Sequence, residues 1–166
     1  MKMATLSEPF AEVAQRHRRE LLAYLVRLLG PGEAEDICQE TFSRAWSAFG
    51  RLRPDSNARA WLYRIATNVA LNHLRRRRRE AARIVQSDLE LIPATAPPDA
   101  DERERLARVV RAVNSLPGKQ RSALLQRLFQ ELDYREIGLV LGCTPEAARA
   151  NVYQALRKLR RQLAGL

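Results

Sequence analysis

The chain has 166 residues, and its 29 lysines and arginines outnumber its 19 aspartates and glutamates, for a formal net charge of +10. This length allows one domain or two small ones, and the positive charge favours a polyanionic partner such as nucleic acid. The longest apolar run near the N-terminus, Leu21 to Val26, is stopped by Arg27 and no signal core is present, so we expect a cytoplasmic protein without membrane insertion.

The periodicity of apolar residues is helical and strand alternation is absent, so an all-α fold is predicted. A first helix follows a cap at Ser7 and ends at Gly30-Pro31. A second helix is predicted from about Glu33 to Phe49, with an apolar side and an opposite polar side. The polar side carries Asp36, Gln39, Glu40, Ser43 and Ser47.

A third helix is predicted after the turn-rich loop 50–57, capped by Ser56 or Asn57 and reaching Arg79. Its apolar side carries Trp61, Leu62, Ile65, Ala66 and Val69. Its outer side carries Tyr63, Arg64, Thr67, Asn68 and Arg75. Residues 57–83 hold eight basic residues and one acidic residue, which predicts a first contact with a polyanion.

The following stretch, residues 84–104, reverses the charge with six acidic residues and one basic residue, and it contains three prolines. This composition predicts a flexible linker. A fourth helix is predicted over 102–114 and a fifth over 117–130. Residues 105–166 carry twelve basic residues and four acidic ones, which predicts a second contact with the polyanion.

The C-terminal segment has the pattern of a helix-turn-helix. Asp133 and Glu136 form a capping box that opens a short helix, Gly142 suits a left-handed turn, and Thr144 caps the last helix. The predicted core residues of that helix are Ala148, Val152, Leu156 and Leu159. A helix in the major groove needs long hydrogen-bonding and cationic side chains. This helix supplies Arg149, Asn151, Gln154, Arg157 and Lys158.

The cysteines and histidines form no pattern of a metal site or a disulfide framework. Cys38 and Cys143 lie far apart without a CxxC pair, and only two histidines are present. We therefore expect reduced, structural thiols, no metal and no cofactor.

Two groups of motifs resemble those of bacterial RNA polymerase sigma factors. Region 2 of that family is resembled by Glu35–Phe42, Ala45-Trp46, Trp61–Asn68, Leu74 and the run Arg75–Arg79. Region 4 is resembled by Leu116-Pro117, Gln120-Arg121, Leu132–Gly138 and Leu141-Gly142. Nothing similar to regions 1 or 3 lies between the two groups of motifs, and this layout is similar to that of the extracytoplasmic-function group.

The resemblance implies two small helical domains joined by a flexible linker. Residues 1–83 would be the region 2 bundle, residues 84–104 the acidic, proline-containing linker, and residues 105–166 the region 4 helix-turn-helix. The implied function is that of a sigma factor in the bacterial cytoplasm, which is not an enzyme and is a monomer when free. Its implied partners are core RNA polymerase, promoter DNA as duplex and melted strand, and an anti-sigma factor that holds it inactive.

The resemblance also implies three sets of contact residues. The second helix would dock on core polymerase through Asp36, Gln39, Glu40 and Ser43. The opened −10 element would be bound by Asn57, Arg59, Arg64, Asn68, Arg75 and Arg76. The −35 duplex would be read by Thr144, Arg149, Asn151, Gln154, Arg157 and Lys158. Trp61 is either a core residue or a platform on which a base stacks.

The last helix departs from the family pattern at two places. The family usually carries a β-branched residue at the position of Ala148, and a small hydroxyl residue followed by arginine at Ala150-Asn151. Ala148 weakens the local core, and Asn151, in place of a cation, can contact an adenine edge.

An autonomous helix-turn-helix regulator that dimerises through its N-terminal half is the main alternative. The polar side of the second helix and the second basic segment argue against it, because a dimerising half would show an extended apolar seam. A nucleic-acid enzyme needs a carboxylate cluster or a nucleophile among arginines, and Tyr63 and Tyr153 lie in no such setting. Whether the two halves close against each other in the free protein and hide the DNA surfaces stays open.

Overall fold

The computed structural model describes residues 9–83 and 100–164, and these form α-helices without a strand. The helices are α1 (Phe10–Leu29), α2 (Pro31–Phe49), α3 (Ala58–Arg83), α4 (Ala100–Asn114), α5 (Gly118–Phe129), α6 (Tyr134–Leu141) and α7 (Pro145–Gln162). The all-α prediction is confirmed. The predicted cap Ser7 and most of the predicted linker lie outside the described residues.

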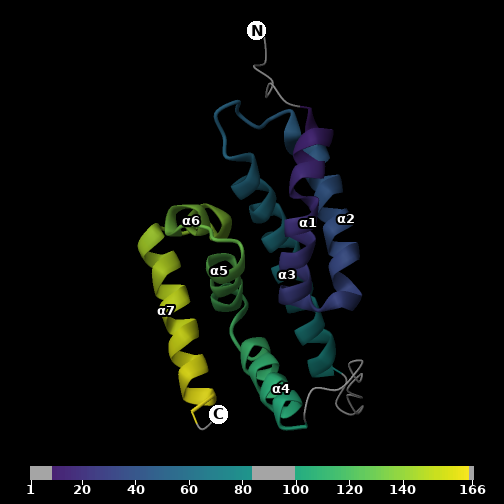
Figure 1. Cartoon of the computed structure of the whole chain (residues 1–166). Helices are drawn as coiled ribbons and strands as arrows, with labels where there is room; N and C mark the ends of the chain where they lie inside the picture. The colour runs from purple at the N-terminus through teal and green to yellow at the C-terminus, as the bar shows by residue number, and fades with distance from the viewer. Residues whose placement is uncertain (1–8, 84–99, 165–166) are drawn as a thin grey trace.

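Helices α1 to α3 form the N-terminal bundle, shown from purple to teal in Figure 1. Gly30 separates α1 from α2 with a φ of 96°, a value that suits glycine because it lacks a Cβ. Pro31 then occupies the first turn of α2, where its missing N–H leaves no hydrogen bond unmade. The second helix therefore begins two residues before the predicted Glu33.

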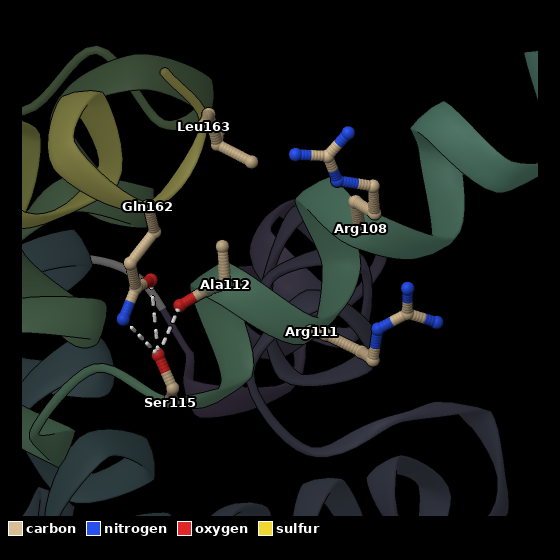
Figure 2. Close-up of a pocket in the computed structure, with 6 residues that line it drawn as sticks. All are labelled: Arg108, Arg111, Ala112, Ser115, Gln162 and Leu163. Atoms are coloured by element: carbon tan, nitrogen blue, oxygen red, sulfur yellow. Dashed lines mark hydrogen bonds between the residues drawn. The ribbon is translucent and has the colours of Figure 1, made fainter. Parts of the chain in front are cut away.

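Helices α4 to α7 form the C-terminal bundle, in which α5 packs against both α6 and α7. The ends of α4 and α7 are tied together by Ser115 and Gln162, whose Oγ and Nε2 atoms are 3.1 Å apart. Figure 2 shows this pair in the shallow cleft between the two helices, with Arg111 pointing away from it. The contact ties the C-terminal end of α7 to the end of α4.

The two bundles pack against each other through one continuous core. Helix α5 lies against α1 and α3, and α6 lies against α3 (Figure 1). Buried leucines of α1, such as Leu21 and Leu25, belong to the same apolar cluster as Leu124 and Leu125 of α5. The sequence leaves open whether the two halves of the chain close against each other. In this structure they do.

The closed arrangement corrects one prediction about α3. Tyr63 and Thr67 were assigned to its outer side, but both side chains are fully buried. They face the C-terminal bundle, which covers this side of the helix. Helical periodicity within one segment identifies a second face but not the partner that covers it.

Both cysteines are free thiols, Cys38 buried in α2 and Cys143 half-buried in the turn before α7. Burial raises the pKa of the Cys38 thiol, which keeps it protonated and unreactive. In the parts of the chain that the structure describes, no helix is both long and apolar enough to cross a membrane.

Candidate nucleic-acid interface

The helix-turn-helix is formed by the residues that the sequence predicts for it. Asp133 Oδ1 accepts a hydrogen bond from the backbone N–H of Glu136 at 2.8 Å, and Glu136 Oε2 accepts one from that of Asp133 at 3.0 Å. Gly142 adopts the left-handed conformation, with φ 65° and ψ 42°. Thr144 Oγ1 accepts from the backbone N–H of Ala147 at 3.2 Å and caps α7. These contacts fix the angle at which α7 leaves the bundle.

Helix α7 has a buried side and a broad exposed side. The buried residues are Ala148, Val152 and Ala155, with Leu156 and Leu159 packed against them. The exposed residues include Arg149, Ala150, Tyr153, Gln154, Arg157 and Lys158. Three of the predicted −35 residues, Arg149, Arg157 and Lys158, are thus exposed cations on this one side. Such a surface can contact phosphates and base edges of a duplex.

The other predicted −35 residues make contacts within the protein. Asn151 is half-buried and donates from Nδ2 to the backbone oxygen of Ala147 at 2.9 Å. Gln154 Oε1 accepts a hydrogen bond from Gln120 Nε2 at 2.7 Å. Thr144 serves as the cap of α7. In this structure, the amide donor of Asn151 is therefore used in a hydrogen bond within its own helix.

Tyr153 was not among the predicted −35 residues, yet it is 63% exposed. It lies four residues after Arg149 and four before Arg157, so these three side chains share one side of the helix. The sequence could have indicated the exposure of Tyr153, because it lies four residues after the predicted contact residue Arg149.

The predicted −10 residues on α3 fall into two groups. Arg64, Asn68, Arg75 and Arg76 are exposed. Of these, Arg75 donates from Nη1 to Asn72 Oδ1 at 3.1 Å. Trp61 is half-buried and lies near Phe49, with ring centroids 6.2 Å apart. The exposed group forms a basic and amide-bearing side of α3.

The second group, Asn57 and Arg59, is held by contacts within the protein. Asn57 Oδ1 caps α3 by accepting from the backbone N–H of Ala60 at 2.9 Å, and its Nδ2 donates to Glu136 Oε1 at 3.0 Å. Arg59 Nη2 donates to Glu20 Oε2 at 2.8 Å and to the backbone oxygen of Gln130 at 2.9 Å. Both side chains therefore bridge to the C-terminal bundle.

The Arg59–Glu20 pair is electrostatically coupled. Hydrogen bonding to Glu20 raises the pKa of Arg59, so the guanidinium stays charged. Burial raises the pKa of Glu20, but hydrogen bonds from Arg59 and His17 outweigh it, so the net pKa lies below the ordinary value. The pair is thus ionised near neutral pH.

The predicted polymerase-binding residues lie along one side of α2. Asp36, Gln39 and Ser43 are exposed, and half-buried Glu40 forms an ion pair with Arg44 at 2.5 Å. Trp46 extends this side and is 67% exposed, with its ring 5.4 Å from that of Phe10. Exposed tryptophans are enriched at protein–protein contact surfaces. The sequence could have indicated the place of Trp46, because it lies three residues after Ser43 and therefore on the same side of the helix.

A buried polar cluster joins the two bundles behind these surfaces. The hydroxyl of Tyr24 in α1 lies 2.9 Å from Thr67 Oγ1 in α3 and 2.7 Å from Ser122 Oγ in α5. Gln126 of α5 donates from Nε2 to Tyr24 Oη at 3.1 Å. All four side chains are fully buried. Burial raises the pKa of Tyr24, so it remains a neutral hydroxyl that can both donate and accept.

No group of three or more histidine, cysteine, aspartate or glutamate side chains that could hold a metal is found within the described ranges. The candidate surfaces consist of basic and amide side chains on α3 and α7 and a polar side on α2.

Two family models match this chain. The model of sigma-70 region 2 matches residues 13–80, which lie within α1 to α3. The model of sigma-70 region 4 matches residues 106–159, from within α4 into α7.

Known proteins match over most of the chain. The RNA polymerase sigma-H factor of Pseudomonas aeruginosa is 33% identical over 162 residues, covering 91% of this chain and 84% of the relative. The RNA polymerase sigma factor CarQ of Myxococcus xanthus is 30% identical over 160 residues, covering 96% of this chain and 91% of the relative.

Two solved structures share the fold. The sigma factor RpoE in complex with the anti-sigma factor NepR from Bartonella quintana matches with a TM-score of 0.72 and 24% identity, covering 94% of this chain and 97% of that chain. CnrH in complex with the cytosolic domain of CnrY matches with a TM-score of 0.65 and 25% identity, covering 93% and 87% respectively.

Proposed function

Because this chain belongs to the extracytoplasmic-function group of RNA polymerase sigma factors, we propose that it binds core RNA polymerase and directs it to promoters. The observation that carries the proposal is the presence of three exposed surfaces on one chain. These are the polar side of α2, the exposed side of α3 and the exposed side of α7. The protein then acts in the cytoplasm as an initiation factor and not as an enzyme.

The polar side of α2 is the proposed docking surface for polymerase. Asp36, Gln39 and Ser43 are exposed there, and Trp46 adds a large apolar area beside them. Acidic and amide groups attract a complementary basic surface, and the aromatic ring supplies the desolvated anchor of a contact. The predicted Glu40 contributes only after its pair with Arg44 rearranges.

The exposed side of α3 is the proposed site for the melted −10 strand. Arg64 and Asn68 offer a cation and an amide one helical turn apart, and Arg75 and Arg76 continue the positive charge. Cations can pair with the phosphates of a single strand, and an amide can contact an unstacked base.

The exposed side of α7 is the proposed reader of the −35 duplex. Arg149 lies near the N-terminal end of the helix, which is the end that contacts base edges in helix-turn-helix proteins. Arg157 and Lys158 lie further along and are proposed to contact phosphates.

Binding of a promoter requires the bundles to separate. The −10 and −35 elements lie several nanometres apart on DNA, whereas α3 and α6 are in direct contact here. Asn57 and Arg59, both assigned to the −10 strand, are also held by contacts to Glu136, Glu20 and Gln130. The closed arrangement is therefore the proposed resting form, and an anti-sigma factor is the proposed partner that keeps the protein inactive. One matching structure is of a sigma factor in complex with an anti-sigma factor, which supports this assignment.

Capture of core RNA polymerase tests the proposal. The wild-type chain should retain core polymerase, and the Asp36→Arg/Glu40→Arg double variant should lose it, because two charges on the docking surface are reversed. The matched control is Glu12→Arg/Glu80→Arg, which makes the same change in net charge at exposed positions of α1 and α3.

Retention by the control and loss by the α2 variant, with both variants folded by circular dichroism, is the expected result. If the wild type captures no polymerase but binds duplex DNA with salt sensitivity, the autonomous regulator replaces the sigma factor as the function.

A further inference from the structure

A cleft rich in arginine lies where the end of α3 meets the start of α5, and neither the DNA surfaces nor the polymerase surface includes it. It measures about 440 Å³ and is lined by residues of both bundles. Arg77 and Arg78 come from α3, Asn114 ends α4, and Gly118 and Arg121 belong to α5. Leu29, Leu74, Ala81 and Leu116 add apolar side chains to the lining.

A second, smaller hollow of about 260 Å³ adjoins the first and shares Arg78 and Gly118 with it. It adds Arg75 and Lys119 to the lining. The two hollows thus gather five cationic side chains, and the described residues that line them include no carboxylate. Among the five, Arg77 has an ion pair outside the cleft, with Glu33 at 3.0 Å.

Arg121 is the central group of the cleft because it is charged, buried and incompletely paired. It is 8% exposed, and its Nη2 donates to the backbone oxygen of Arg27 at 3.1 Å. Its Nε has no hydrogen-bond partner among the residues described. Burial lowers the pKa of Arg121, and the nearby charges of Arg78 and Arg77 lower it further. Within the described residues, no carboxylate forms an ion pair with this buried guanidinium.

The first turn of α5 adds backbone donors to these cations. Pro117 precedes the helix and provides no side-chain cap, so the first N–H groups of α5 have no such acceptor. Gly118 and Lys119 carry two of these groups and line the hollows. A helix N-terminus with free N–H groups and a positive dipole end favours a phosphate.

From these features we infer that the cleft binds a small molecule with a chain of two or more phosphates. Several converging guanidinium groups and backbone N–H groups match the donors that a polyphosphate needs. The volume is that of a small-molecule site, and a DNA duplex is too wide to enter it. The larger cleft lies about 20 Å along α3 from Arg64, by the rise of 1.5 Å per residue. The two sites meet at Arg75, which lines the smaller hollow and also belongs to the proposed −10 surface.

A ligand in this cleft contacts both bundles, so it stabilises the closed arrangement. Arg77 and Arg78 belong to the N-terminal bundle, and Arg121 and the first turn of α5 belong to the C-terminal bundle. A ligand that binds only the closed form shifts the protein towards it. Binding of a phosphorylated small molecule in the cleft would therefore increase the fraction of the protein in the resting form.

Calorimetric titration of the full chain with inorganic tripolyphosphate and with ATP, at constant ionic strength, tests the inference. The wild type should bind tripolyphosphate saturably, and Arg78→Gln should weaken binding about tenfold or more through the loss of one charged hydrogen-bonding group. The matched control is Arg79→Gln, because Arg79 is the next exposed arginine of the same run and does not line either hollow. Equal affinities for the two probes would mean that the site recognises the phosphate chain alone. Tighter binding of ATP would mean that its nucleoside also contacts the apolar side chains of the cleft.

Arg121→Gln provides a second variant and should abolish saturable binding if it folds. Equal weakening in Arg78→Gln and Arg79→Gln would overturn the inference, since it would mean diffuse attraction to the arginine run. Absence of saturable binding by the folded wild type up to millimolar probe would overturn it as well. Neither result depends on capture of polymerase, so this test is independent of the proposed function.

Discussion

Tyr24 illustrates how a single polar side chain can hold two bundles together. Its hydroxyl is fully buried and lies within hydrogen-bond distance of Thr67, Ser122 and Gln126, which come from α3 and α5. A buried polar group contributes stability only when it is paired, and a partner left unpaired costs more than the bond itself contributes. Tyr24 therefore favours this one arrangement of the bundles over others that would leave the hydroxyl unpaired.

Replacement of Tyr24 by phenylalanine should lower the free energy of unfolding by about 1–3 kcal/mol, because three buried polar groups lose a partner. Urea denaturation of the full chain measures this change. Tyr153→Phe is the control, since Tyr153 is exposed on α7 and should change stability by less than about 0.5 kcal/mol. Equal effects of the two substitutions would mean that the buried polar cluster does not hold the bundles.

Glu20 and Arg59 give the bundle interface a dependence on pH. The folded pKa of Glu20 lies below 4.5, because hydrogen bonds from Arg59 and His17 outweigh the effect of burial. A lowered carboxyl pKa contributes stability above the unfolded value, and this contribution is lost as pH falls through the folded value. The wild type should therefore lose stability on acidification below about pH 4.5 more steeply than Glu20→Gln does.

Thermal unfolding of both proteins over a series of pH values measures the difference. Glu12→Gln, an exposed change on the same helix, should leave the steep acid dependence of the wild type in place. Parallel curves for the wild type and Glu20→Gln would rule out this role for the carboxylate.

The caps and the turn that position the site could be predicted at the level of residues, for a physical reason. Caps and turns depend on neighbours in sequence, so Asp133, Gly142 and Thr144 were assigned correctly, and Asn57 was one of two candidates for its cap. Tyr63 was not assigned correctly, because its burial depends on the other bundle.

At the level of elements, α7 combines a structural side with an exposed side. Ala148, Val152 and Ala155 pack inward, while Arg149, Tyr153 and Arg157 face solvent. The helix was predicted from the apolar period, and its exposed cations follow from the same period. The contact of Asn151 with an adenine edge stays a prediction, and in this structure its Nδ2 donates to the backbone oxygen of Ala147. Side-chain hydrogen bonds of this kind are local competitors that a helical period does not reveal.

Arg149→Ala should reduce discrimination between promoter and non-promoter sequences, whereas Arg160→Ala should lower affinity for all sequences about equally. The reason is that Arg149 lies at the end of α7 that contacts base edges, and Arg160 lies near the other end, where phosphate contacts are expected. Binding of the holoenzyme to a library of −35 sequences measures both effects. A uniform loss of affinity in Arg149→Ala would assign that residue to phosphate instead.

At the level of the whole molecule, the predicted pair of helical bundles is present, but the bundles share one core and a buried polar cluster. This packing could not be predicted from the sequence, because each bundle satisfies its own helical periods and the contact joins residues about one hundred positions apart, such as Tyr24 and Gln126. A tether alone allows many relative positions, whereas a shared core selects one. We infer that this closed form is the resting state of the protein and that an open form starts transcription.

A reversible bridge between the bundles tests this claim most directly. Arg27 and Phe129 suit the test because both are exposed, they belong to different bundles, and the Arg27 Cζ lies 4.4 Å from the Phe129 ring centre. The chain would carry Arg27→Cys and Phe129→Cys together with Cys143→Ser, and a reducible thiol reagent would join the two new cysteines. Buried Cys38 would stay in place, and the two single-cysteine chains are the controls.

Transcription by core polymerase from a library of genomic promoter fragments is the readout. We predict that the bridged chain starts no transcription, that reduction restores it, and that both single-cysteine chains stay active throughout. A bridged chain as active as its reduced form would contradict the claim, because the bundles would then not need to separate.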